Sequence, residues 1–143
     1  MSIKTDLSDL IRALARRDWG TADRLTAELG RQGWAGGLQT IGAAFAIAVH
    51  RRFGSEASAA DVARFVAEVR SQVPNGDELP ALEMEGLIRA VLGEPELVDN
   101  ISADLALGAQ TFLLGALLQD ENLTEQQLEG FIAEVEQTAA RYL

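Results

Sequence analysis

The run Ile41–Val49, IGAAFAIAV, decides the fold, because it is the longest uninterrupted stretch of apolar and small residues in the first half of the chain. A second run, Leu105–Leu118 (LALGAQTFLLGALL), matches it in the second half. Neither run has the alternation of a half-buried strand or the charged face of a surface helix, so each is predicted to be a helix that is apolar on most sides. Both are shorter than the ~18 to 20 residues that cross a bilayer. We therefore expect two central helices inside a helical bundle.

Five further segments carry apolar residues at the i, i+3, i+4 and i+7 spacing of an amphipathic helix. Gly20 is expected to separate the first two helices, and Ser58 and Thr124 begin capping-box patterns at the fourth and seventh. The expected helices span about 5–17, 21–31, 38–52, 58–73, 80–92, 102–119 and 124–142. The sequence thus predicts an all-α fold, a compact single-domain bundle of about seven helices.

The two halves resemble each other at low identity. Shifting the chain by 66 residues aligns residues 38–71 with 104–137, with 6 identities in 34. The matches include Gly42 with Gly108, and the motifs F-[VI]-A-E-V that begin at Phe65 and Phe131. An internal duplication, 5–73 and 78–142, would give two pseudo-symmetric α-α-α units around the two central helices, with the second helix an addition to the first unit. Two copies are too few for a solenoid, so a closed bundle is expected.

Composition places the chain among ordinary globular proteins. Its 143 residues, 48% of them hydrophobic, suffice for one self-sufficient core. There is no cysteine, which fits a reducing compartment, and the first residues lack the apolar core of a signal peptide. We expect a cytoplasmic protein without membrane association, and its alanine- and arginine-rich composition suggests a bacterial source of high GC content.

Charge is distributed unevenly along the chain. Residues 1–71 hold ten Lys and Arg against eight Asp and Glu, whereas residues 72–143 hold two against fourteen. Nucleic acid is a poor partner for the second half, because phosphates are bound by Lys and Arg. Such an acidic surface serves solubility, attracts a basic partner, or pairs with the basic half of another copy, and these alternatives stay open.

The search for chemistry returns no recognisable site. His50 is the single histidine, and its place beside Arg51 and Arg52 in the last turn of a helix is explained by the helix dipole. No metal-ligand spacing, calcium loop, phosphate loop or nucleophile motif is present. Carboxylate pairs such as Glu83 with Glu85 are explained as solvated surface, since nothing predicts the burial that would raise a pKa. We expect no enzymatic activity, no metal and no cofactor.

The last helix is expected to present an acidic face to a basic partner, because it carries no positive charge before Arg141. That face consists of Glu125, Glu129, Glu134 and Glu136. Trp19 and Trp34 flank the second helix in or near turns, where an aromatic residue can anchor a partner. Ordinary half-buried packing of both tryptophans is the alternative.

A pocket between the two central helices is a further hypothesis. Gln110 and Thr111 are polar residues in the otherwise apolar sixth helix, and bundles build ligand sites between such helices. Phe45 and Phe112 would wall the pocket from the two sides. Alternatively, the two polar side chains bond to neighbouring backbone.

Two functions follow from these patterns. The first is an acidic, non-catalytic protein-interaction or regulatory module, similar in kind to an antitoxin, immunity or adaptor protein, which uses its negative C-terminal half to bind a basic partner. The second is a carrier or sensor of a small hydrophobic ligand. Homodimerisation is compatible with either, because opposed charges on the two halves favour self-contact.

Overall fold

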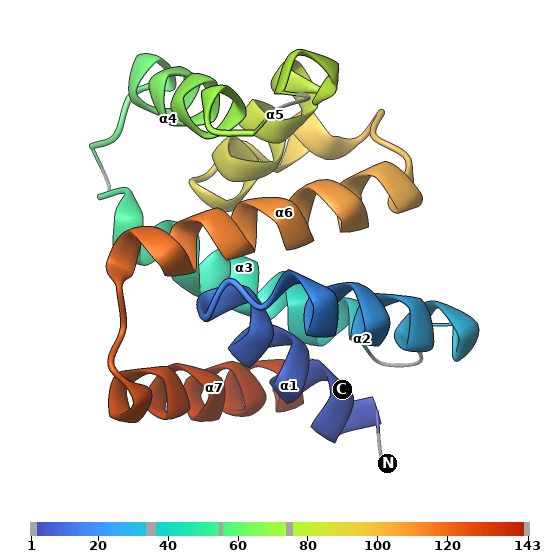
Figure 1. The fold of residues 1–143 in the computed structure, drawn as a ribbon. Helices are drawn as coiled ribbons and strands as arrows, with labels where there is room; N and C mark the ends of the chain where they lie inside the picture. Colours follow the sequence, from blue (N-terminus) through green and yellow to red (C-terminus); the bar gives the residue numbers. More distant parts are fainter. Residues whose placement is uncertain (1–2, 34–36, 55, 74–75, 142–143) are drawn as a thin grey trace.

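Seven α-helices and two short 3₁₀-helices make up the part of the chain that the computed structural model describes, residues 3–33, 37–54, 56–73 and 76–141 (Figure 1). They are α1 (Ile3–Ala15), α2 (Trp19–Arg31), α3 (Gly37–Arg52), α4 (Ala59–Ser71), η1 (Gly76–Glu78), α5 (Ala81–Val91), η2 (Pro95–Val98), α6 (Ala103–Glu121) and α7 (Glu125–Ala140). These residues contain no strand, and none of their helices has the length and apolarity that a membrane span requires. The predicted all-α bundle is confirmed.

The two apolar runs form α3 and α6, which pack against each other at the centre of the molecule. In Figure 1, α4 and α5 lie above this pair and α1 and α7 below it. Phe45 of α3 is buried, and so are four leucines of α6, namely Leu113, Leu114, Leu117 and Leu118. The first half of α6 is different, because only Ala109 is buried between residues 104 and 112. One side of this apolar helix therefore lacks a cover.

A tight corner joins α1 to α2, and it differs from the expected one. The amide of Asp18 donates to the carbonyl of Ala13 at 2.9 Å and that of Arg17 to Leu14 at 3.3 Å. This is the bond pattern of a Schellman motif. Arg17 takes the left-handed conformation at φ 60°, a position that glycine usually fills. Gly20, predicted to separate the helices, lies inside α2.

Helix caps begin α4 and α7 where the sequence predicts them. The hydroxyl of Ser58 accepts from the amide of Asp61, whose carboxylate accepts from the amide of Ser58, and this reciprocal pair begins α4. Thr124 and Gln127 form the same box at the start of α7. Because both boxes use only residues three apart, local sequence was enough to locate them.

The predicted duplication pairs α3 with α6 and α4 with α7, and the contacts of these pairs differ. α7 packs against α3, whereas α4 packs chiefly against α5. At positions related by the 66-residue shift, Ile41 and Phe45 are buried, but Leu107 and Thr111 are only half-buried. The duplication stays a prediction. The helices that it pairs differ in their cover, because α6 has an open side where α3 is buried.

Candidate functional site

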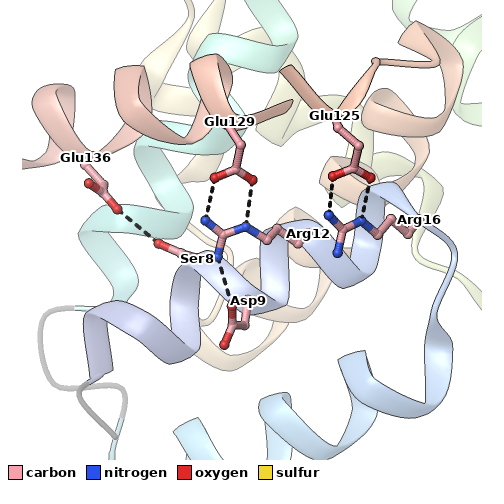
Figure 2. Close-up of polar contacts among 7 residues, drawn as sticks. All are labelled: Ser8, Asp9, Arg12, Arg16, Glu125, Glu129 and Glu136. Atoms are coloured by element: carbon pink, nitrogen blue, oxygen red, sulfur yellow. Dashed lines mark hydrogen bonds and ion pairs between the residues drawn. The ribbon is translucent and has the colours of Figure 1, made fainter. Parts of the chain in front are cut away.

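The glutamates of α7 form ion pairs with arginines of the first half of the chain. Arg12 donates to both carboxylate oxygens of Glu129, from Nε at 2.8 Å and from Nη2 at 2.7 Å, and Arg16 makes the same two-bond contact with Glu125 (Figure 2). One further turn along, the hydroxyl of Ser8 donates to Glu136 at 3.1 Å. Ser8 and Arg12 lie one turn apart on one face of α1, and Arg16 follows one turn later, directly after the helix ends, so α1 and α7 meet in antiparallel register.

The end of α3 makes a second set of pairs with the second half. Arg51 donates to Glu134 at 2.9 Å and lies 3.7 Å from Glu121, and Arg52 donates to Asp120 at 3.1 Å. The guanidinium of Arg51 also stacks over the ring of Phe131, 5.1 Å from its centre. The acidic face predicted on α7 is therefore neutralised from within the chain. Sequence reasoning saw no positive charge on that helix, but the positive charges come from other helices.

These contacts favour the charged forms of both partners. The pKa of Glu129 is lowered, mainly because Arg12 hydrogen-bonds to its carboxylate. The same bonds raise the pKa of Arg12 above its ordinary value. The pKa of Glu94 is lowered by Arg89 in the same way. The Arg12–Glu129 pair thus holds two distant helices together in its charged form.

Most carboxylates of the second half that lie outside these pairs fall within one segment of the chain. Residues 76–105, which form η1, α5, η2 and the first turn of α6, contain eight carboxylates and one arginine, Arg89. Among the residues that the structure describes, seven of these carboxylates make no side-chain ion pair, namely Asp77, Glu78, Glu83, Glu85, Glu96, Asp99 and Asp104. We call residues 76–105 the acidic end; it carries most of the net charge of −10.

Exposed leucines accompany this charge. Leu82 is 80% exposed, and Leu97 and Leu105 are each 37% exposed. Leu97 packs close to Gly86, where an added Cβ would lie 3.4 Å from the carbonyl oxygen of Leu97. Leu82 lies one turn before Gly86 on the same face of α5, and so on the side where η2 packs. The acidic end therefore combines negative charge with apolar side chains, and sequence periodicity had not singled out these leucines.

A groove of about 1000 Å³ runs along the open side of α6. Its floor is one face of α6, from Asp104 through Leu107, Gly108, Thr111 and Phe112 to Gln119. The first turns of α2, including Trp19, form one wall, and the end of α4 with the residues after it, including Val73, forms the other. Because α2 packs chiefly on α1, and α4 chiefly on α5, neither helix covers α6.

The predicted site residues are divided between this groove and other places. Thr111 and Phe112 line the groove together with Trp19, which is 50% exposed. Phe45 is 1% exposed in the core, and Gln110 is half-buried outside the groove lining. Trp34 lies outside the described residues. The groove therefore lies on the side of α6 between α2 and α4, rather than between α3 and α6 as predicted.

Other chemistry is sparse in the described part of the chain. His50 is exposed at the end of α3, and no group of three or more histidine and acidic side chains is placed to hold a metal ion. The hydroxyl of Thr111 donates to the carbonyl of Leu107 at 2.8 Å, so the backbone bond that was the alternative for this residue is present at the groove floor.

No protein-family model matches the chain, and neither a curated protein nor a solved structure matches it. Function is therefore inferred from the surfaces of the chain itself.

Proposed function

We propose that the protein is a non-catalytic interaction or regulatory module that binds a basic partner protein through its acidic end. The observation that carries the proposal is the division of the acidic residues. Those of α7 are paired with Arg12, Arg16 and Arg51, whereas those of residues 76–105 are mostly unpaired and lie among exposed leucines.

The physical basis is electrostatic attraction followed by apolar burial. Unpaired carboxylates on the surface create a negative field, which raises the rate of encounter with a basic protein. Leu82, Leu97 and Leu105 offer the apolar area that a stable contact needs at its centre. The α7 glutamates would have to give up their arginines before they could bind a partner, and they are therefore assigned a structural role.

The absence of cysteine and the composition of the chain support a bacterial cytoplasm as the place of action, with a role of the antitoxin, immunity or adaptor kind. The same proposal includes a homodimer, in which the acidic end of one copy binds the basic half of another.

Charge reversal tests this function with matched variants. The first variant combines Glu96→Lys and Asp99→Lys at the acidic end, and the control combines Glu56→Lys and Glu68→Lys, which changes the net charge equally at exposed carboxylates elsewhere. Tagged proteins are used to capture partners from bacterial lysate at low and high salt, and captured proteins are identified by mass spectrometry.

The expected result is a basic protein that is captured at low salt, released at high salt, lost by the acidic-end variant and retained by the control. Equal capture by both variants, or capture that salt does not change, would contradict the proposal.

A second candidate function, binding of a small hydrophobic ligand, is favoured by the volume of the groove and by the presence of Phe112 and Thr111 in it. It predicts that added fatty acids raise the melting temperature of the wild-type protein, and that Phe112→Trp removes this rise. A melting temperature that stays constant across a series of chain lengths would exclude that function.

A further inference from the structure

We infer that the groove over α6 receives an amphipathic α-helix of the partner protein, with the apolar face of that helix on α6 and its cationic end beside Asp104. This inference rests on the proposed function, because it names the part of a basic partner that binds. It assigns a second contact surface, separate from the leucines of α5 and η2.

The shape of the groove fits a helix. Its floor spans sixteen residues of α6, from Asp104 to Gln119, which is about 22 Å at the rise of an α-helix. That length corresponds to about four turns of a bound helix. An elongated groove with walls along both sides suits a rod, which packs ridges into grooves, better than a compact ligand.

The floor is built for close approach of another backbone. Gly108 lies about one turn from its Asp104 end, and a Cβ added there would meet no neighbouring atom within 4 Å. Leu107 and Phe112 provide apolar area on either side of this glycine. A helix laid along α6 could therefore come close at Gly108 and bury both of these side chains.

Charge sets the chemistry of the occupant. Asp104 lines the groove at the N-terminal end of its floor. Arg17 lines it from the α1–α2 corner, next to Leu14, which packs against Gly115 in the C-terminal half of α6. Asp104 itself belongs to the acidic end, whose other carboxylates are mostly unpaired in the described residues. A helix with lysine or arginine at the Asp104 end matches this gradient, whereas an acidic helix would be repelled there.

The chain itself contains an example of the packing that we infer. α7 packs against α3 and is held there by arginine–glutamate pairs at its edges. On α3 the residues Ile41 and Phe45 are buried, whereas their counterparts under the 66-residue shift, Leu107 and Thr111, border the open groove. A helix from a partner would give α6 the cover that α3 already has.

The test uses a defined probe, a fluorescein-labelled synthetic peptide of fifteen residues with leucines along one face and its lysines at one end. Binding is measured by fluorescence anisotropy at low salt with wild-type protein and two glycine variants. Gly108→Trp fills the groove, and Gly130→Trp makes the same change at an exposed helical glycine of α7 whose Cβ position is also open. Circular dichroism melts establish that both variants fold.

We expect saturable binding to the wild type, a loss of at least about tenfold in affinity for Gly108→Trp, and unchanged affinity for Gly130→Trp. Asp104→Lys should lower the affinity for the lysine peptide by about tenfold and raise the affinity for a peptide with glutamates in place of lysines. Opposite effects on the two peptides are expected only if the cationic end of the peptide lies beside Asp104. A general loss of structure would weaken the binding of both peptides.

Equal affinity of the two tryptophan variants would overturn the inference, and so would a fatty acid that binds in a Gly108-dependent manner while no peptide does. These failures are distinguishable from failure of the proposed function. If charge reversal at Glu96 and Asp99 still abolishes capture of a basic protein, the function stands and only the groove assignment falls.

Discussion

At the scale of single residues, Arg17 is one of two residues other than glycine that have a positive φ in the described chain. Its left-handed backbone, φ 60°, is disfavoured for a residue with a Cβ by about 1 kcal/mol. The Schellman bonds of the α1–α2 corner hold it there. The corner in turn fixes the position of Trp19 on the wall of the groove. A strained arginine is therefore part of what shapes the groove.

Relief of this strain is measurable by comparing two substitutions that both remove the side chain. Arg17→Gly should be more stable than Arg17→Ala by about 1 kcal/mol, because only glycine adopts positive φ without steric cost. Urea unfolding of the two variants gives the difference directly. If Arg17→Ala were equally stable, the corner would not require the left-handed conformation.

Prediction from sequence succeeded at residues whose partners are local and failed at this corner. Ser58 and Thr124 were identified as caps because their bonding partners lie three residues away. The break between α1 and α2 was assigned to Gly20, since glycine is the usual signal for positive φ. Arginine carries no such signal, and the tertiary packing of the two helices imposes the conformation instead.

At the scale of helices, α6 combines two environments in one apolar sequence. The leucines of its C-terminal half are buried in the core, while another face of the helix, from Asp104 to Gln119, forms the groove floor. The sequence predicted a central helix because apolar residues occur on all of its sides. Periodicity cannot tell which side is covered, because the cover depends on where α2 and α4 pack. The groove was therefore expected on the wrong side of α6.

Gly108 lowers the intrinsic stability of α6, because glycine is a poor helix former. Because it lies inside the helix, and a Cβ there meets open space, Gly108→Ala should raise the free energy of unfolding by about 0.5–1 kcal/mol. Urea unfolding monitored by circular dichroism tests this, with Gly130→Ala in α7 as the parallel case. A destabilised Gly108→Ala protein would show that the space above residue 108 is already filled.

At the scale of the whole molecule, part of the uneven charge along the sequence is neutralised by ion pairs within the fold. Arg12, Arg16, Arg51 and Arg52 of the first half all pair with carboxylates of α6 and α7. The sequence revealed the imbalance between the halves, but pairing depends on which helices lie side by side. Among the carboxylates of the second half in the described residues, those without an ion pair are gathered mainly at the acidic end, where they are left for a partner.

The ion pairs make stability depend on pH in a definite direction. The pKa of Glu129 is lowered in the folded protein by the hydrogen bonds from Arg12. A lowered pKa stabilises the fold above the ordinary glutamate pKa of about 4.3, and this contribution is lost as pH falls through the lowered value. The raised pKa of Arg12 keeps the arginine charged throughout this range.

Glu129→Gln should therefore lower the urea midpoint at pH 7, and the difference from wild type should shrink toward zero as pH falls below about 4. Glu78→Gln, which removes an exposed carboxylate without an ion pair in the described residues, should leave the midpoint unchanged at both pH values. A difference for Glu129→Gln that persisted in acid would mean that the side chain contributes by packing. If the difference in urea midpoint shrinks in acid for Glu129→Gln while Glu78→Gln has no effect, then α1 and α7 are held together by charge. The division into paired and unpaired carboxylates requires this result.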